Sequence, residues 1–176
     1  MKKKERLNLS SYIRAIADFP KPGILFRDIT TLLQDKKAFR CSIDLLAKEY
    51  KSRKIDVVVA VESRGFIFGS TLAYKLKAGF VPVRKKGKLP FKTIEATYSL
   101  EYGQDSLSIH QDAFKPCANI LICDDLLATG GTVKAVTELV TKLKGNIVGI
   151  CFLIELVDLK GIEKLKGYTV FSLIKY

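Results

Sequence analysis

The stretch that decides the fold is residues 120–132, ILICDDLLATGGT. It begins as an apolar β-type run, which we expect to end at the two carboxylates Asp124 and Asp125. A short loop of small and hydroxyl residues follows, and Thr132 opens an amphipathic helix. Ligands of an open parallel sheet bind beyond the carboxyl ends of its strands. A helix N-terminus offers unpaired backbone N–H groups to an anion. The stretch therefore predicts a strand–loop–helix site that holds a phosphate.

The residue types narrow the ligand further. Gly130 and Gly131 let the backbone come close to an anion, and the two acids can accept hydrogen bonds from hydroxyls. Phosphate on one side and a diol on the other describe a sugar phosphate. A Walker A loop is excluded because no Lys precedes Thr132, and the three spaced glycines of a dinucleotide fingerprint are absent. The competing interpretation is an ordinary strand–turn–helix with a Thr cap. Two adjacent acids at a buried strand end favour the ligand site, since such a pair is costly without a partner.

Composition indicates one globular domain. The chain has 176 residues, and its hydrophobic content of 48% excludes disorder. No apolar run approaches the roughly 20 residues of a membrane span. The basic N-terminus is not followed by an apolar signal region, so we expect a cytoplasmic protein without membrane contact. Four dispersed cysteines and a single histidine do not suggest zinc.

The net charge of +12 raises the question of nucleic-acid binding. The basic residues are spread over predicted helix faces, and no RNA-binding aromatic motif or zinc finger is present. A positive field also attracts a polyanionic small substrate. We therefore expect no nucleic-acid partner.

Hydrophobic periodicity predicts alternating strands and helices. We expect a first helix over residues 9–17, a Pro/Gly-rich loop over 22–28, and a second helix capped by Asp35. Further along, the pattern predicts strands at 57–61, 80–84, 147–154 and an edge strand at 169–173, a hairpin from 95–102 and 105–110, and helices after Arg64 and over 132–143. The fold class is α/β, with an open, mostly parallel twisted sheet flanked by helices.

The quoted stretch closely resembles the binding motif for 5-phosphoribosyl 1-pyrophosphate (PRPP) in type I phosphoribosyltransferases. Four other segments resemble adenine phosphoribosyltransferases of that family: residues 18–29 their base-binding hood, 62–66 their pyrophosphate loop, and 83–90 and 98–103 their basic and catalytic-loop segments. These segments occur in the family's order and together cover most of the chain.

The resemblance implies the reaction of adenine with PRPP to give AMP and pyrophosphate, with Mg²⁺, in a homodimer. It also implies a single domain over 1–176, with an N-terminal hood over 1–34, a core over 35–176 and a flexible β-hairpin loop. Two alternatives stay open: a non-enzymatic PRPP-binding regulator on the same fold, and a phosphoribosyltransferase for another purine base. Retention of Glu101 and Phe26 favours the enzyme.

The resemblance also implies roles for individual residues. The 5-phosphate is assigned to Ala128, Thr129, Gly130, Gly131 and Thr132, the ribose to Asp124 and Asp125, the pyrophosphate to Ser63, Arg64, Arg84, Lys85 and Lys88, and adenine to Leu25, Phe26 and Arg27. Glu101 is the implied catalytic carboxylate, as base or as stabiliser of the sugar cation, and Tyr102 serves loop closure.

Chemistry qualifies several of these roles. Asp124 and Asp125 should act unequally, since side chains alternate along a strand. Mg²⁺ prefers substrate oxygens and water to an all-protein cage, so no direct protein ligand is assigned.

Surface charge remains the competing interpretation for Lys85 and Lys88 and is preferred for Lys86. His110 lies outside every motif and is not expected to be catalytic. The peptide near Ser63 is often cis in the family.

Overall fold

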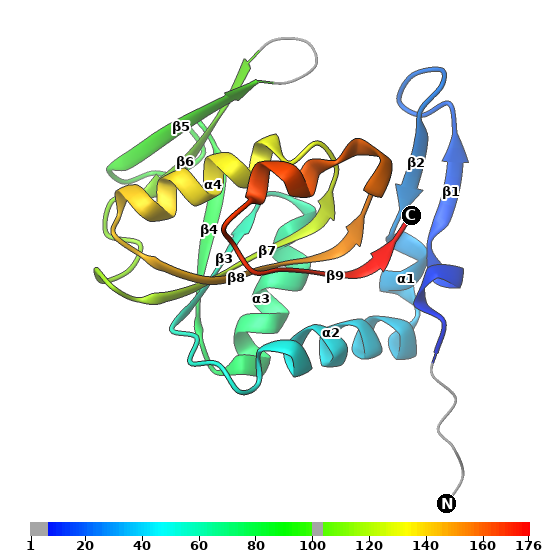
Figure 1. Cartoon of the computed structure of the whole chain (residues 1–176), viewed down its shortest axis with the longest axis horizontal. Helices are drawn as coiled ribbons and strands as arrows, with labels where there is room; N and C mark the ends of the chain where they lie inside the picture. Colours follow the sequence, from blue (N-terminus) through cyan, green and yellow to red (C-terminus); the bar gives the residue numbers. More distant parts are fainter. Residues whose placement is uncertain (1–6, 100–103) are drawn as a thin grey trace, which may run out of the picture. The chain divides into compact units, whose positions relative to one another are not determined.

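The computed structural model describes residues 7–99 and 104–176. The chain separates into two compact units, Met1–Leu45 and Leu46–Tyr176. Figure 1 draws the elements in the colours of the sequence. In the described part of the chain, no helix combines the length and apolarity that crossing a bilayer requires.

The first unit is built from short elements. In chain order these are the 3-10 helix η1 (Leu9–Tyr12), strands β1 (Arg14–Ala17) and β2 (Leu25–Asp28), helix α1 (Thr30–Gln34) and the start of α2 (Lys36–Tyr50). Asp35 caps α2 as predicted, because its Oδ1 accepts the N–H groups of Lys37 at 2.9 Å and Ala38 at 2.8 Å.

The first helix predicted from the sequence is wrong. Only Leu9–Tyr12 is helical, and Arg14–Ala17 is a strand that pairs antiparallel with Leu25–Asp28. That second strand lies inside the segment predicted as a loop. The helical spacing of a few apolar residues is weak evidence in so short a segment, since an isolated helix of this length is marginal. Pairing with β2 gives the same backbone groups regular hydrogen-bond partners.

The second unit is centred on a sheet. Its elements are β3 (Val57–Val61), α3 (Arg64–Leu76), β4 (Gly79–Lys85), β5 (Thr93–Ser99), β6 (Gln104–His110), β7 (Asn119–Leu127), α4 (Gly131–Lys142), β8 (Asn146–Glu155), the 3-10 helices η2 (Val157–Leu159) and η3 (Gly161–Leu165), and β9 (Val170–Lys175). Over the described ranges, seven strands pair in the order β5-β6-β4-β3-β7-β8-β9.

The sheet is mostly parallel, as predicted. Strand β3 pairs in parallel with β4 and β7, β7 with β8, and β8 with the edge strand β9. The hairpin β5–β6 joins β4 in antiparallel fashion. Because helices link the parallel strands, their carboxyl ends lie at one edge of the sheet.

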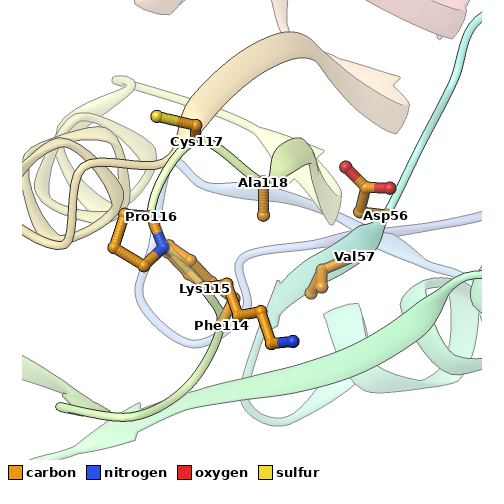
Figure 2. Close-up of a pocket in the computed structure, with 7 residues that line it drawn as sticks. All are labelled: Asp56, Val57, Phe114, Lys115, Pro116, Cys117 and Ala118. Carbon is orange, nitrogen blue, oxygen red and sulfur yellow. The ribbon is translucent and has the colours of Figure 1, made fainter.

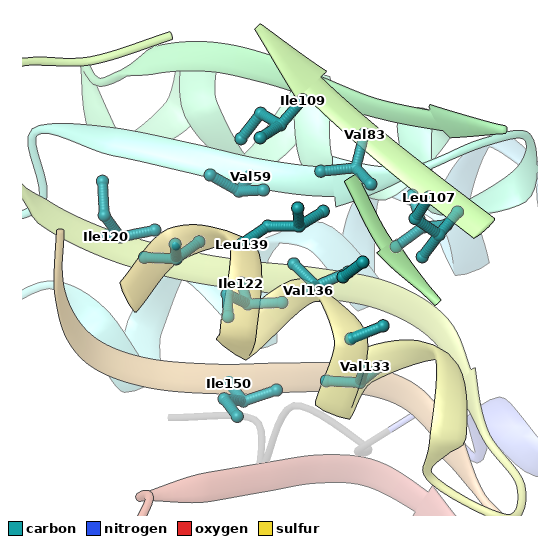
Figure 3. Close-up of a cluster of buried hydrophobic side chains, with 14 of the residues drawn as sticks. Val59, Val83, Leu107, Ile109, Ile120, Ile122, Val133, Val136, Leu139 and Ile150 are labelled. Atoms are coloured by element: carbon teal, nitrogen blue, oxygen red, sulfur yellow. The ribbon is translucent and has the colours of Figure 1, made fainter. Parts of the chain in front are cut away.

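Alternation along the central strands divides the core between two layers. Val59 and Ile122 lie in one cluster with Val136 and Leu139 of α4, and Figure 3 shows α4 lying over this face. Helix α3 contacts β3 and β7 on the opposite face, where Gly69 allows close approach because a Cβ there would collide with the Cβ of Ala60. The helices therefore cover both sides of the strands that carry the site.

Strand β7 is longer than the sequence suggested. The apolar run was expected to end at Asp124 and Asp125, but β7 continues to Leu127 and pairs Leu126 and Leu127 with β8. Burial of Leu127 against the core explains the extension. The two acids consequently lie inside strand β7 and not at its end.

Candidate active site

Three chain segments meet at the carboxyl edge of the parallel sheet. Residues 62–65 follow β3, Arg84 and Lys85 end β4, and residues 124–132 span the end of β7 and the start of α4. Strand β3 lies between β4 and β7 in the sheet. The topology thus brings together the segments assigned to pyrophosphate, ribose and 5-phosphate, at the edge where open α/β sheets bind ligands.

The loop after β7 forms a small cavity at the start of α4. Its volume is about 70 Å³, and its lining is Asp124, Leu126, Leu127, Ala128, Thr129, Gly130, Thr132 and Val133. Gly130 is the N-cap of α4 with φ of 77°, a left-handed conformation that favours glycine. The cavity lies at the positive end of the helix dipole. It has the size and polarity to hold one oxyanion group.

The two acids of β7 are buried. Asp124 is 9% exposed and Asp125 is 6% exposed. Burial raises the pKa of the Asp124 carboxyl well above its usual range, and the neighbouring Asp125 charge adds to the increase. Burial also raises the pKa of Asp125, while the Arg64 guanidinium opposes that change. Such shifts mark groups held at a cost to folding, which is typical of functional sites.

Arg64 joins the pyrophosphate segment to the ribose segment. Its Nε lies 2.9 Å from Oδ2 of Asp125. This contact is an ion pair without hydrogen-bond alignment, because the same Oδ2 is buried and accepts no hydrogen bond from the described residues. The preceding Glu62–Ser63 peptide is cis, as the resemblance implied. Asp125 therefore keeps an oxygen able to accept a further donor.

Arg84 and Lys85 are organised by Glu62. Both Nε and Nη2 of Arg84 lie 2.8 Å from Oε2 of Glu62, and the Lys85 N–H donates to its Oε1 at 2.7 Å. Burial alone would raise the pKa of Glu62, but the hydrogen bonds from Lys85 and Arg84 outweigh it and the pKa is lowered. Nη1 of Arg84 also donates to the Lys88 carbonyl at 3.1 Å, which ties the basic loop to the strand end.

The lysines of this region differ in their partners. Lys85 Nζ lies 2.9 Å from Oδ2 of Asp105 on β6, and Lys86 Nζ lies 3.0 Å from Oε2 of Glu95 on β5. Lys88 is exposed. The structure thus brings Lys85 next to the start of β6. Lys86 belongs to a surface ion pair, consistent with its interpretation as surface charge.

Three residues of this site received no role in the sequence analysis. Glu62 holds Arg84, Asp105 holds Lys85, and Gly65 lies so close to Asp124 that a Cβ would come within 2.5 Å of its Oδ1. The position of Glu62 directly after a buried strand was a usable signal. The partnership of Asp105 was not, because it depends on the antiparallel register of β4 and β6.

The residues assigned to adenine lie on β2, in the first unit. Phe26 is half-buried and meets Phe19 edge to face, with ring centroids 5.1 Å apart. Leu25 is 49% exposed, and Arg27 pairs with Ala15 across the β1–β2 ladder. Glu101 and Tyr102 fall outside the described residues, between the ends of β5 and β6.

His110 lies at the opposite end of the β5–β6 ladder from the pair formed by Ser99 and Gln104. It pairs with Thr93, the first residue of β5. Its ring meets Phe91 at 6.2 Å, and its buried Nε2 has no hydrogen-bond partner among the described residues. This position is remote along the hairpin from the predicted catalytic loop.

A larger cavity, about 420 Å³ in volume, lies at the opposite end of the strands. Figure 2 shows its lining, in which Val57 begins β3 and Ala118 precedes β7. None of the residues predicted for the site lines it. Size alone would favour this cavity, but the residues predicted to bind a sugar phosphate lie at the smaller one.

The described residues contain no cluster of three or more His, Cys, Asp or Glu side chains arranged to hold a metal ion. The two carboxylates of β7 nonetheless fit Mg²⁺ chemically, since a hard cation takes oxygen ligands and keeps several waters. Oδ2 of Asp125 pairs with Arg64 by charge but accepts no hydrogen bond from the described residues, so it is suited to accept one from such a water.

Comparison with known proteins agrees with this geometry. Residues 28–174 match the phosphoribosyl transferase domain family. The chain belongs to the phosphoribosyltransferase family. Two relatives, from Clostridium botulinum and Brachyspira hyodysenteriae, are 56% and 57% identical over 170 residues, which is 97% of this chain and 99% and 100% of theirs. Both are adenine phosphoribosyltransferases, and this confirms the group expected from the motifs.

Solved structures give the same result. Adenine phosphoribosyltransferase from Thermoanaerobacter pseudethanolicus superposes with a TM-score of 0.93 at 54% identity, covering 96% of this chain and 98% of that one. The enzyme from Saccharomyces cerevisiae, solved with adenine and an imino-altritol bisphosphate, gives 0.89 at 43% identity, covering 94% and 96%. The predicted fold class is confirmed.

Proposed function

We propose that this protein transfers the 5-phosphoribosyl group from PRPP to adenine, giving AMP and pyrophosphate. This makes it a pentosyltransferase of purine salvage. The observation that carries the proposal is the phosphate-sized cavity at the N-terminus of α4, which the buried Asp124 lines and next to which Asp125 follows in the strand. The full-length relatives that act on adenine support the choice of base.

In this proposal the 5-phosphate binds at the loop 128–132, in the cavity that Ala128, Thr129, Gly130 and Thr132 help to line. Backbone N–H groups at the start of α4 and the hydroxyls of Thr129 and Thr132 are its donors. Asp124 and Asp125 face the ribose hydroxyls, whose O–H groups can donate to the carboxylates. Burial keeps these hydrogen bonds in a medium of low polarity, where they are stronger than in water.

Pyrophosphate is placed among Ser63, Arg64, Arg84, Lys85 and Lys88. In the reaction the bond from C1 of ribose to the pyrophosphate oxygen breaks, a bond to a ring nitrogen of adenine forms, and that nitrogen loses its proton. Negative charge accumulates on the leaving group, so cations held in place beforehand lower the barrier. Glu62 supplies this preorganisation by fixing Arg84 and the Lys85 backbone.

Mg²⁺ belongs to this proposal as a substrate-bound ion. When bound, it neutralises charge on the departing pyrophosphate. Asp124 and Asp125 would hold its waters. The proposal also includes the catalytic carboxylate Glu101, loop closure by Tyr102, and adenine recognition by Leu25, Phe26 and Arg27 of the hood. A cytoplasmic homodimer with a single domain, divided at residues 34 and 35 into hood and core, completes it by analogy with the family.

Calorimetric titration of the protein with PRPP, in the presence of Mg²⁺, tests the assignment of the 128–132 loop as the 5-phosphate site (the phosphate cradle). Gly131→Val places a branched side chain at the start of α4, and we expect PRPP affinity to fall by about tenfold or more, equivalent to roughly 1.4 kcal/mol. Gly79→Ala is the matched control, because its Cβ would lie 3.6 Å from the nearest atoms, an ordinary contact. Normal PRPP affinity in a folded Gly131→Val protein would refute the cradle.

A further inference from the structure

A second glycine contacts the phosphate loop from outside the cavity. Gly161 begins η3, is buried, and follows Lys160, whose φ of 51° is left-handed. A Cβ on Gly161 would collide with the carbonyl oxygen of Ala128 and lie 2.9 Å from the backbone nitrogen of Gly130. Backbone therefore meets backbone here, with no room for a side chain.

The contact is reciprocal. A Cβ on Gly130 would collide with the carbonyl oxygen of Gly161 and lie 3.1 Å from its carbonyl carbon. Gly130 is the N-cap of α4, with its left-handed φ of 77°. Its lack of a side chain is thus required twice, by its conformation and by the approach of η3. Gly161 itself does not line the cavity.

The position of η3 is fixed by the core. Leu165 at its end is 1% exposed and lies in the same cluster as Val133, in the first turn of α4. The segment that presses on the loop and the helix that follows the loop are therefore anchored to one another. If a methyl group were added between the loop and η3, one of the two would have to move. Moving η3 away would disturb the packing of Leu165 in the core.

The contact also turns the Ala128 carbonyl oxygen, which would repel an anion, toward η3. The Ala128 carbonyl oxygen lies against Gly161, on the side of the loop that η3 covers. A carbonyl oxygen is a hydrogen-bond acceptor, so one that faced the cavity would repel a phosphate instead of binding it. Keeping this oxygen against η3 leaves the N–H groups at the start of α4 for the anion.

We infer that Gly161 is a positioning residue for the 5-phosphate subsite: the missing side chain lets η3 hold the 128–132 loop in its anion-binding shape. This inference rests on the proposed function, because the ligand of the loop is the 5-phosphate of PRPP. Gly161 affects one subsite only. Binding at the loop depends on Gly161, whereas binding at the Arg84 and Lys85 segment does not.

The test compares ribose 5-phosphate and pyrophosphate, each titrated by calorimetry in the presence of Mg²⁺. Gly161→Ala should weaken ribose 5-phosphate binding by about tenfold or more, since overpacking at the loop displaces its donors. Pyrophosphate affinity should change by less than about twofold, because substitutions at distant sites normally affect each other's binding free energies only slightly. In steady-state kinetics KM for PRPP should rise more than kcat falls.

Gly145→Ala is the matched control for simple destabilisation. Its Cβ would lie 2.8 Å from Val140 Cγ1 and 2.9 Å from Phe114 Cε2, so it also overfills the unit, but against core side chains away from the loop. It should lower the melting temperature and leave ribose 5-phosphate affinity unchanged. Equal loss of that affinity in both variants would show that Gly161 is merely structural.

Amide hydrogen exchange on the unmodified protein gives a readout that needs no folded variant. Ribose 5-phosphate should slow exchange in residues 157–165 as well as in 128–132. Protection confined to 128–132 overturns the inference, as does a folded Gly161→Ala protein with normal ribose 5-phosphate affinity. If the unmodified protein fails to bind ribose 5-phosphate at all, the proposed function itself fails at this subsite, and the inference fails with it.

Discussion

Arg64 and Asp125 form an ion pair, with 2.9 Å between Nε and Oδ2, so a candidate pyrophosphate ligand is bound to a candidate ribose ligand. The arginine offsets part of the cost of burying the acid, since its charge opposes the increase in the pKa of Asp125 that burial causes. Pyrophosphate arriving at Arg64 would compete for the same guanidinium. The two halves of the proposed PRPP site are therefore electrostatically coupled before substrate binds.

Arg64→Gln should reveal this coupling. Removing one partner leaves Asp125 buried without its cation, and we expect a loss of about 1–2 kcal/mol, below the 3–5 kcal/mol of a fully buried pair because the Arg64 side chain is 36% exposed. Denaturant unfolding of Arg64→Gln, Asp125→Asn and the double variant measures the interaction as a double-mutant cycle. Strictly additive effects would mean that the pair contributes nothing.

Asp124→Asn and Asp125→Asn should both reduce turnover, by different routes. Asp124 lines the phosphate cavity, and its Oδ1 accepts the Asp125 N–H at 2.9 Å. Asp124→Asn should therefore weaken ribose 5-phosphate binding more. Asp125→Asn removes the partner of Arg64 and should alter pyrophosphate binding more. Calorimetry with each ligand separates them, and full activity in both variants would eliminate the ribose-binding role.

The melting temperature should depend on pH through Asp124. The folded-state pKa of this buried carboxyl is raised, so its favourable contribution is fully present below the unfolded pKa of about 3.9 and is lost as pH rises through the folded pKa. Asp124→Asn lacks that loss. Its melting temperature should exceed that of the unmodified protein by a margin that grows toward neutral pH, at about 2–4 °C per kcal/mol. A difference in melting temperature that stays constant from acid to neutral pH would contradict a raised pKa for Asp124.

Glu62 should show the opposite sign. Its pKa is lowered in the fold, so its contribution is present above the unfolded pKa of about 4.3 and disappears as pH falls through the folded value. In the same melting experiment, Glu62→Gln should be less stable than the unmodified protein at neutral pH and approach it in acid. Freed from Glu62, Arg84 should also bind pyrophosphate less well. Unchanged stability and pyrophosphate affinity would remove Glu62 from the site.

Glu101→Gln tests the catalytic loop. A general acid or base is typically worth about 10²–10⁴-fold, and we expect kcat to fall within this range with little change in PRPP affinity. His110→Gln is the control, because His110 lies at the other end of the hairpin and should leave kcat nearly unchanged. A loss below about threefold for Glu101→Gln, well under that typical range, would demote Glu101 to a loop residue.

Local sequence signals predicted the core of this fold well. The β-branched run of Val57–Val61, the Asp35 cap and the Gly130 turn all specify their structure through neighbouring residues alone. Residues 9–17 did not, because the strand there depends on pairing with β2. The boundary of β7 was likewise set by pairing with β8 and by burial of Leu127.

The same distinction applies to the candidate site. The sequence singled out Asp124, Asp125 and the loop 128–132 because one contiguous motif carries them. The contacts of Glu62 with Arg84, of Asp105 with Lys85, and of Gly161 with Gly130 join residues that are distant in sequence. Only the strand order and register bring them together. A motif therefore identifies candidate ligand-binding residues more readily than the residues that hold them in place.

The base used with PRPP tests the central claim most directly. Adenine presents an amine donor where hypoxanthine and guanine present a carbonyl acceptor. In the proposed site, backbone groups near Leu25 and Arg27 would distinguish the two, and Phe26 would pack on the ring. Protein, PRPP and Mg²⁺ should be incubated in parallel with adenine, guanine, hypoxanthine, xanthine and orotate, and nucleotide formation followed. We predict AMP from adenine, with kcat/KM exceeding that for hypoxanthine by about 10⁴–10⁵, as expected for a site built around a hydrogen bond. Equal use of hypoxanthine and adenine, or no nucleotide from adenine, would contradict the account.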